Sequence, residues 1–555
     1  MEHQGTIWEN KMQLFRFCLK YLWKYKVSFV TYILINIFMG LIAIILPLIS
    51  GNLIDSLTST KSANALYQYL AVFLIISILQ LLLGFLSQYL YTKVQTKSGY
   101  AVNSDTLKHI QKLSMSFIDN TETGYLIQRI NNDSNEVIIF SIGIIINVCV
   151  NLITLTLSFM LLLHINTVLA VALLFLIGLY WVIYKLFKKP LYRRNLELKE
   201  QQAKFFSKLL EQLTKLRFFK THEIISLFMK KLDESFFSLL KQSISKQKLN
   251  YAFTSCETAL NLVAQFSIFL FGGLSVINGT LTIGFFTVLL SYFSMMIKSA
   301  RYFFNLGSSY QNTLVSYNRL LEILNQPIPL EGTEKIARIN SIRIKDLSFQ
   351  YSDKPVFKNF SLSLEKGKLY ALTGVNGSGK STLIDILLGL YPEEYSGSIL
   401  YNNIELRELK KDVLRKFNIG LTEQEPQLIP DTIYNNLTLY ENVDHSLLQY
   451  LIQIMGLANY IQTLPEGMNT KINESSTNLS GGEKQKISII RQLIKNNDFM
   501  IFDEPTSALD KASKENFWAY INKIKKEKII LVVTHDSNVK LLCDENIELK
   551  KFNTP

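Results

Sequence analysis

Long stretches without a charged side chain fill most of the first half of the chain and restrict its fold more than any other feature. A helix of about 20 residues crosses the hydrocarbon core of a bilayer. Such stretches predict membrane spans at 27–50, 66–91, 137–163 and 165–184, and two more within 258–297. The last stretch is divided by Asn278-Gly279-Thr280, a turn signal. We therefore expect six spans, with both ends of the chain on the same side of the membrane.

Basic residues flank these stretches, and the chain carries a formal net charge of +13. They cluster before the first span, between the second and third spans and after the fourth, whereas the opposite loops hold little beyond Asp55 and Lys61. Because Lys and Arg concentrate on the cytoplasmic side of membrane proteins, both termini are expected in the cytoplasm. The pattern favours an integral protein of the bacterial plasma membrane, and no nucleic-acid partner is expected.

The sequence changes character after residue 325. Pro327 and Pro329 mark a linker, because two prolines so close together are poorly tolerated inside a helix. From about Ser341, short alternating strands and turns replace the long apolar stretches. The predicted organisation is an α-helical transmembrane domain at 1–325, whose spans extend as long cytoplasmic helices, a linker at 326–340 and an α/β P-loop ATPase domain at 341–555.

A glycine-rich loop opens the second domain. Residues 372–382 read Leu-Thr-Gly-Val-Asn-Gly-Ser-Gly-Lys-Ser-Thr, after an apolar strand-like run and before a helix-like run. Small residues let consecutive backbone N–H groups surround phosphate oxygens, and the following helix directs its positive N-terminus toward them. Lys380 adds a positive charge, and Ser381 offers a hydroxyl to Mg²⁺. The predicted nucleotide-binding residues of this loop are Gly374, Asn376, Gly377, Gly379, Lys380, Ser381 and Thr382.

An acidic strand and a second glycine-containing motif follow. The apolar run 499–502 ends in Asp503, a candidate Mg²⁺ ligand, and Glu504, a candidate general base. Taken alone, this run could equally be a strand with a solvated acidic end. Leu479-Ser480-Gly481-Gly482-Glu483 supplies an N-cap and leaves backbone N–H groups open to an anion, although it could also be an ordinary helix start.

These motifs, in this order, resemble the ATP-binding cassette family, and the six-span arrangement resembles its exporters with one membrane domain and one cassette in each chain. The resemblance implies roles for further residues. Tyr351 matches the aromatic residue that stacks on adenine, and Gln424 matches the glutamine that contacts Mg²⁺ and the attacking water. His535 matches the histidine that contacts the γ-phosphate, and Asp510 ends the loop that crosses to a partner cassette.

The resemblance further implies a transport ATPase with ATP and Mg²⁺ as cofactors. Its catalytic residues would be Glu504, His535 and Gln424, and its metal ligands Ser381, Gln424 and Asp503. The signature residues Ser480, Gly481 and Gly482 would close over the nucleotide of a second subunit. The expected partner is therefore a second copy of the chain, in a homodimer, or a homologous half-transporter.

The resemblance implies efflux of a substrate across the lipid bilayer by alternating access. A peptide is the preferred substrate, with a lipid or an amphipathic drug as alternatives. An ATP-gated channel or sensor, or an importer on the same fold, is the alternative function. Two short segments bear on coupling between the domains: residues 117–119 resemble a cytoplasmic connection of such exporters, and Glu474 lacks the glycines that usually flank it.

Glu257 is an acidic residue directly before the fifth predicted span. An ionisable residue inside a membrane domain is a functional candidate by default. One hypothesis is that Glu257 lines the transport cavity and favours substrates with positive charge. The alternative is that it lies at the inner interface, where it is solvated or paired with Lys248.

Overall fold

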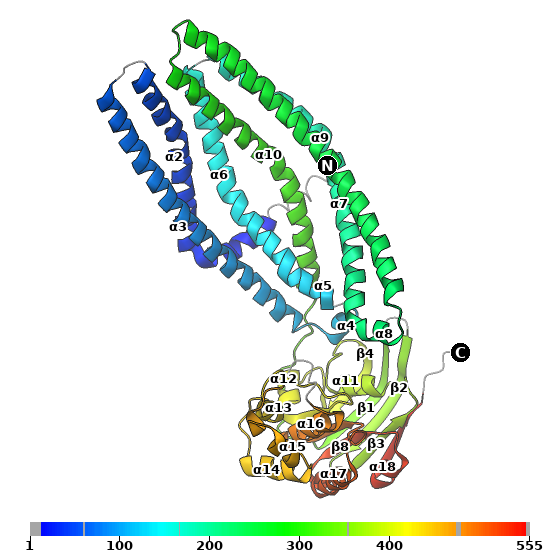
Figure 1. Cartoon of the computed structure of the whole chain (residues 1–555). Helices are drawn as coiled ribbons and strands as arrows, with labels where there is room; N and C mark the ends of the chain where they lie inside the picture. The colour runs from blue at the N-terminus through cyan, green and yellow to red at the C-terminus, as the bar shows by residue number, and fades with distance from the viewer. Residues whose placement is uncertain are drawn as a thin grey trace. The chain divides into compact units, whose positions relative to one another are not determined.

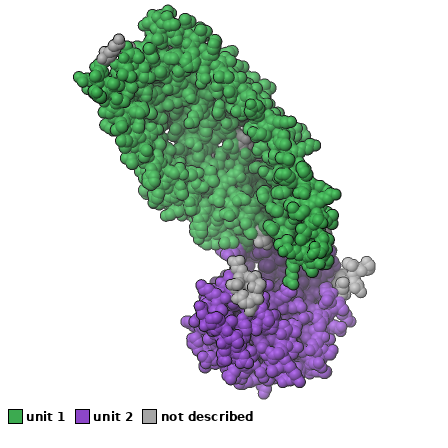
Figure 2. Space-filling view, in the orientation of Figure 1, with its two compact units in different colours: residues 1–110, 123–325 green, residues 111–122, 326–555 purple. Residues whose placement is uncertain are grey.

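The computed structural model describes residues 13–58, 62–121, 123–165, 167–351, 354–472 and 479–550. The chain divides into two compact units (Figures 1 and 2). Unit 1 comprises residues 1–110 and 123–325, and unit 2 comprises residues 111–122 and 326–555. Unit 1 is helical and unit 2 combines two sheets with helices, which confirms the predicted fold class.

Unit 1 consists of long helices that continue the apolar stretches beyond the thickness of a bilayer. Its principal helices are α2 (Lys26–Thr58), α3 (Ala63–Ile110), α6 (Ser134–Ile165), α7 (Thr167–Thr214), α9 (Ile225–Ile277) and α10 (Ile283–Leu324). At 1.5 Å per residue, the 53 residues of α9 extend for about 80 Å, whereas the hydrocarbon core is about 30 Å thick. The predicted helical extensions are therefore confirmed.

Five helices in the described part of the chain are long and apolar enough to cross a membrane: 13–58, 63–110, 124–164, 225–277 and 283–324. They contain every predicted span except the fourth. That span, 165–184, forms the first part of α7 and is helical from Thr167, although α7 is not one of the five. The turn predicted at 278–280 lies between α9 and α10.

The helices of unit 1 pack in antiparallel pairs, with α2 against α3, α7 against α9 and α6 against α10 (Figure 1). Helix α10 also packs against α2, and a Cβ on Gly284 would lie only 2.0 Å from the Gly51 carbonyl oxygen. Asp55 holds this crossing, because its carboxylate accepts hydrogen bonds from the Gly284 N–H (2.8 Å) and the Thr282 hydroxyl (2.6 Å). Asp55, which was expected in a loop after the first span, thus lies within α2 and joins two helices.

Unit 2 is built on an antiparallel sheet with the order β2-β1-β4-β5 and a parallel sheet with the order β6-β7-β8-β3-β9. The antiparallel strands are β1 (Ser341–Tyr351), β2 (Lys354–Glu365), β4 (Tyr395–Tyr401) and β5 (Ile404–Glu405). The parallel strands are β3 (Leu369–Gly374), β6 (Ile419–Thr422), β7 (Phe499–Asp503), β8 (Ile529–Val533) and β9 (Glu545–Leu549). The helices used below are α11 (Lys380–Leu387), α14 (His445–Ile454), α16 (Gly481–Lys495) and α17 (Lys511–Ile524).

The parallel sheet is covered on both faces, which explains why β7 is apolar along its length. Phe499 and Ile501 belong to the core shared with the antiparallel sheet and α11. Met500 and Phe502 belong to the core formed with α14, α16 and α17. Because parallel strands end at the same edge of a sheet, β3, β6, β7 and β8 bring the residues that follow them together.

One short piece of the membrane-domain sequence packs with unit 2. Helix α4 (Met115–Asp119) follows α3 in the chain, but Met115 packs against the hydrophobic core of unit 2. The Met115 N–H donates to the Leu390 carbonyl (3.4 Å), and the Tyr391 hydroxyl donates to the Asp119 carboxylate (2.5 Å). The segment that resembles a cytoplasmic connection is therefore part of unit 2.

Candidate functional site

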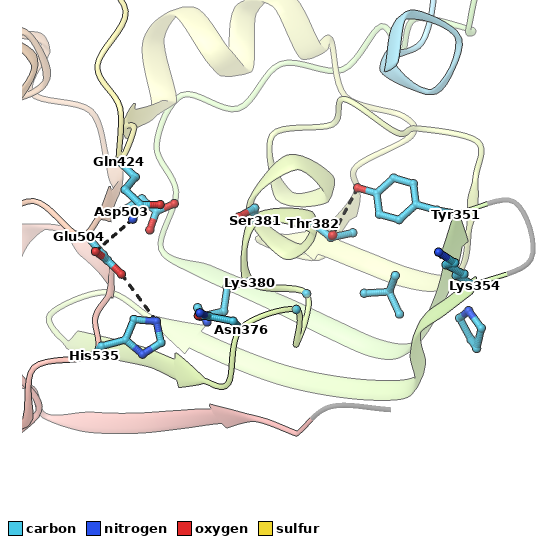
Figure 3. Close-up of a pocket in the computed structure, with 14 residues that line it drawn as sticks. Tyr351, Lys354, Asn376, Lys380, Ser381, Thr382, Gln424, Asp503, Glu504 and His535 are labelled. Carbon is cyan, nitrogen blue, oxygen red and sulfur yellow. Dashed lines mark hydrogen bonds and ion pairs between the residues drawn. The ribbon is translucent and has the colours of Figure 1, made fainter. Parts of the chain in front are cut away.

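A cavity of about 860 Å³ opens where the parallel strands of unit 2 end (Figure 3). Its walls come from the glycine-rich loop, from residues at the ends of β6 and β7 or beyond β8, and from β1 and β2. The lining residues are Tyr351, Lys354, Pro355, Val356, Asn376, Gly377, Gly379, Lys380, Ser381, Thr382, Gln424, Asp503, Glu504 and His535. Most of the residues predicted from separate motifs thus meet at one site.

The glycine-rich loop has the backbone that phosphate binding requires. Helix α11 begins directly after Gly379, whose φ of 95° lies in the left-handed region. Gly379 has no side chain that could cap the helix. A Cβ at Gly379 would lie 2.6 Å from a Val356 side-chain atom, so a larger residue does not fit there. The first N–H groups of a helix have no partner within the helix and are open to an anion. Ser378 adds a buried hydroxyl that has no hydrogen-bond partner among the described residues. These features fit a bound phosphate group.

Lys380 is held beside these open N–H groups. Its ammonium group donates to the carbonyl oxygens of Gly374 (2.8 Å) and Val375 (3.2 Å). Both acceptors belong to the loop itself, so the positive charge lies at the loop and not on a distant carboxylate. The charge is therefore available to phosphate oxygens.

The two acidic residues at the end of β7 have different surroundings. Burial raises the pKa of the Asp503 carboxyl above its ordinary value, and the charge of Glu504 raises it further, while Lys380 and His535 lower it. A cation bound at such a carboxylate stabilises its ionised form, so Asp503 fits a Mg²⁺ ligand. Glu504 has a left-handed φ of 45°, which is uncommon for a residue other than glycine and clusters at functional sites.

Gln424 and His535 flank Glu504 (Figure 3). The Gln424 amide donates to one carboxylate oxygen of Glu504 (3.2 Å), and His535 Nε2 lies 3.6 Å from the other. Residues that follow β6 and β8 thus contact the acid that follows β7. A carboxylate in this setting, open to the cavity, can accept a proton from a water molecule.

Tyr351 and Lys354 lie at the other end of the cavity (Figure 3). The Tyr351 hydroxyl donates to Thr382 Oγ1 (3.3 Å) and lies 3.5 Å from the Tyr391 hydroxyl. Its ring meets the Tyr391 ring edge-on, with 5.8 Å between centroids, and 36% of the residue is exposed. A partly exposed aromatic ring beside the end of the phosphate loop suits a planar base.

Three lining residues, Lys354, Pro355 and Val356, were not predicted from the sequence. They lie at the start of β2, and the antiparallel pairing of Tyr351 with Lys354 brings them to the cavity. No local motif marks them. The short interval between β1 and β2 is the one signal that could have placed them beside Tyr351.

The signature residues do not line this cavity. Ser480 caps α16, because its hydroxyl accepts from the Glu483 N–H (3.3 Å) and the Glu483 carboxylate accepts from the Ser480 N–H (2.6 Å). Gly481 and Gly482 begin the helix, and a Cβ on Gly481 would meet no atom within 4 Å. Glu483, which differs from the glutamine of many family members, thus completes the cap.

Asp510 also lies outside the cavity and joins two helices of unit 2. Its carboxylate accepts from the Ser513 N–H at the start of α17 (2.9 Å) and pairs with Lys486 of α16 (2.7 Å). The Lys486 bond, followed by those from Ser513, holds the pKa of Asp510 well below its ordinary value. The loop that contains Glu474 lies outside the described residues.

Two family models match most of the chain. The model of the ABC transporter transmembrane region matches residues 29–300, and the ABC transporter model matches residues 357–507. This chain belongs to the ABC transporter family. It has the layout of an exporter-type half-transporter, with one transmembrane domain and one C-terminal cassette, and it is an ATPase coupled to transport.

Related ABC transporters match along nearly their whole length. A Bacillus subtilis protein named as a multidrug export ATP-binding/permease protein, YgaD, is 27% identical and covers 92% of this chain and 90% of its own. Staphylococcus aureus proteins with the same descriptive name are 26% identical, over 93% of this chain and 92% of theirs. The structure of a bacterial Atm1-family ABC exporter with ATP bound matches with a TM-score of 0.81 and 17% sequence identity. The match covers 95% of this chain and 94% of the exporter chain. This last likeness shows the fold.

In the membrane domain of the transporter, Glu257 differs from both sequence-based expectations. It is buried, with 5% of the residue exposed, and is neither solvated nor paired with Lys248. The Tyr180 hydroxyl of α7 donates to its carboxylate, and Arg301 Nε of α10 lies 3.6 Å from the same oxygen. The cavity-lining hypothesis assumed a carboxylate free to meet a substrate, whereas this one already has two partners.

Proposed function

We propose that this ABC transporter exports amphipathic molecules, using ATP hydrolysed at the cavity of unit 2. The observation that carries the proposal is the convergence at one sheet edge of a phosphate loop with the Gln424–Glu504–His535 cluster. The loop binds phosphate oxygens through its open N–H groups, and Tyr351 supports the adenine base. Glu504 accepts the proton of the attacking water, which Gln424 orients, and His535 contacts the γ-phosphate.

Mg²⁺ would be held by Ser381, Gln424 and Asp503 and would neutralise charge on the phosphate oxygens. The raised pKa of Asp503 supports this assignment, because a cation favours the ionised carboxylate. Lys380 supplies the second positive charge. Glu504 then differs from Asp503 in role: it faces the water and not the metal.

A half-transporter carries one cassette, so a working transporter requires a second half. The position of Ser480, Gly481, Gly482 and Asp510 outside the cavity of their own chain supports their action on a partner cassette. Every catalytic residue type is present in this chain, which favours a homodimer over a pair with a homologous half-transporter. Opening and closing of the cassette dimer then drives alternating access.

The distribution of Lys and Arg supports a cytoplasmic location for the cassette and both termini, with the helices of unit 1 in the plasma membrane of a bacterial cell. The relatives are named as multidrug export proteins. These names favour an amphipathic drug as the substrate, over a lipid and over the peptide that the sequence analysis preferred.

Inside-out vesicles test the proposal. On addition of ATP, vesicles with the transporter should accumulate a fluorescent amphipathic dye, and vesicles with Glu504→Gln should not. Flux that needs ATP binding but not hydrolysis would indicate a gated channel. ATP-driven loss of dye from preloaded vesicles would indicate import.

A further inference from the structure

Helix α7 carries a cavity with a mainly basic wall just beyond the part of the helix that is expected to cross the membrane. The cavity, of about 470 Å³, is lined by Lys189, Pro190, Arg193, Arg194 and Glu197. Three of these side chains are positively charged and one is negatively charged. We call this site the basic cavity.

The length of α7 places the basic cavity near one surface of the bilayer. The model of the transmembrane region covers this part of the chain, and α7 begins at Thr167. At 1.5 Å per residue, about 20 residues cross a hydrocarbon core of about 30 Å, so the span ends near residue 187. The headgroup layer adds roughly 5–7 Å on each side. Lys189 is therefore expected at the depth of the lipid phosphates, and the long side chains of Arg193 and Arg194 extend back toward them.

The basic cavity faces away from α9, the helix that packs along α7 (Figure 1). Tyr180 and Asn195 mark the packed side of α7. The Tyr180 hydroxyl donates to a carboxylate of α9, and Lys246 of α9 donates to the Asn195 side chain (2.8 Å). Each residue of a helix is turned by about 100° from the one before it. Lys189 and Arg193 therefore lie on the opposite side of α7, away from α9.

The positive charge of the basic cavity is only partly balanced. Arg193 Nε and Arg194 Nη1 lie 3.2 and 2.8 Å from the Glu197 carboxylate, so one carboxylate serves two guanidinium groups. Lys189 forms no ion pair with any described residue. Each guanidinium has five N–H donors, and the Arg193 side chain is 84% exposed. The cavity can therefore bind an anion that has several oxygen atoms.

An exposed apolar strip leads from the basic cavity toward the middle of the bilayer. Val182 and Leu186 precede Pro190 at intervals of four residues, so the three follow one another along one side of α7. The exposed fraction is 45% for Val182 and 67% for Leu186. In a membrane, such side chains meet acyl chains. An apolar strip that ends in a cationic cavity matches a phospholipid better than it matches a free anion.

Trp181 supports this placement of α7 independently. It lies beside the strip and is 49% exposed, and the Lys185 ammonium lies 5.0 Å from the centroid of its ring. Tryptophan is enriched where the hydrocarbon core meets the headgroups, and lysine side chains near the end of a span extend toward the headgroups. Both residues therefore indicate that the membrane surface lies close to the basic cavity.

We infer that the basic cavity binds the headgroup of an anionic phospholipid whose acyl chains lie along Val182 and Leu186. The phosphate oxygens accept hydrogen bonds from Lys189, Arg193 and Arg194. On the orientation proposed above, this lipid belongs to the cytoplasmic leaflet. The inference goes beyond the export proposal, because the lipid is a component of the bilayer and not the transported substrate.

Quenching of tryptophan fluorescence by brominated lipids tests the inference on the full-length transporter in nanodiscs. Bromine on an acyl chain quenches a tryptophan only at close range, so Trp181 reports the lipids along the strip. The chain has four tryptophans, and comparison with Trp181→Phe isolates the signal of this one. In mixed bilayers, phosphatidylglycerol should compete for this position about tenfold better than phosphatidylcholine.

Three double variants separate the cavity from general charge. Arg193→Gln with Arg194→Gln leaves one cation facing one carboxylate, so the preference for phosphatidylglycerol should be lost. Arg193→Lys with Arg194→Lys keeps the charges and should keep most of the preference. Lys199→Gln with Lys204→Gln removes two charges from α7 outside the cavity and should behave as wild type. Thermal melting of each variant shows that it is folded.

Equal competition by the two lipids in wild type would overturn the inference, as would a preference that persists in the folded Arg193→Gln, Arg194→Gln variant. If neither lipid quenches Trp181, protein covers the strip, as a second copy of the chain would, and the inference also fails. Inorganic phosphate in excess should leave the preference unchanged. Loss of the preference in phosphate would overturn the inference, since the cavity would then bind a soluble anion.

Discussion

The two units surround their acidic side chains in different ways. In unit 2, Glu504 lies at the edge of a sheet, open to a large cavity and contacted by Gln424 and His535. In unit 1, Glu257 lies between helices and is contacted by Tyr180 and Arg301. The acid at the strand end faces a cavity that a substrate can enter, whereas the acid between helices is 5% exposed and enclosed by its own domain. The contrast predicts where substitutions abolish activity and where they alter only stability or coupling.

Glu504→Gln should have the largest effect. Hydrolysis should fall by roughly 10²–10⁴-fold, because an amide does not accept the proton of the water, while ATP still binds. Steady-state ATPase activity beside nucleotide binding measures both. Glu515→Gln on α17 is the control and should hydrolyse ATP as wild type does. Wild-type hydrolysis by Glu504→Gln would show that Glu504 is not the general base.

Lys380→Ala should weaken ATP binding by roughly tenfold or more, because a hydrogen bond to a charged group contributes about 1.5–3 kcal/mol. Equilibrium titration with a fluorescent ATP analogue gives the affinity. Lys354→Ala, at the other end of the same cavity, should have a smaller effect. An equal loss of ATP affinity in the two variants would mean that Lys380 does not bind the phosphates.

Tyr391→Phe tests whether the attachment of α4 within unit 2 can be weakened without loss of the site. It removes the hydroxyl that contacts both Asp119 and Tyr351, so transported substrate per ATP should fall a few-fold while hydrolysis continues. The matched control is Tyr395→Phe, which removes a hydrogen bond to Glu405 (3.0 Å) in the same core. If both variants lower the ratio of transport to hydrolysis equally, the effect is general destabilisation.

Glu257→Gln should lower the melting temperature of the protein, because Arg301 loses its counter-charge. Arg301 is partly exposed, so the cost should be small, about 1 kcal/mol. The double substitution Glu257→Gln with Arg301→Gln should recover part of the loss. An unchanged melting temperature of Glu257→Gln would contradict the structural role of this ion pair.

Asp385 of α11 should give the smallest effect. Burial raises the pKa of its carboxyl to about 6, and the charges of Asp119, Glu423 and Asp503 contribute. The folded state therefore binds this proton more tightly than the unfolded state, so the stabilisation present at lower pH is lost as pH rises through about 6. Asp385→Asn should melt at a higher temperature than wild type at pH 7.5, and the difference should become smaller as pH falls from about 6 toward 4. Parallel melting curves at all pH values would contradict the assignment.

A region could be predicted from the sequence where contacts between neighbouring residues form it, and could not where residues far apart in the chain form it. Gly379 and Lys380 could be placed from sequence, because a loop between a strand and a helix fixes its own backbone. Glu257 could be recognised as unusual, but its partners Tyr180 and Arg301 depend on how three helices pack, which no local pattern records. The hydrogen bond between Asp119 and Tyr391 joins residues 272 positions apart, and it could not be predicted from the sequence either.

That separation has a consequence for biosynthesis. At about 5–20 residues per second, the ribosome makes Tyr391 roughly 15–55 s after Asp119. During this interval α4 has left the ribosome, but Leu390 and Tyr391, which will hold it, do not yet exist. The helices on either side of α4 must therefore insert while the segment between them is without its final contacts. Completion of the membrane domain waits for folding of the cassette, and a chain that stops before Leu390 leaves α4 exposed to proteases and chaperones.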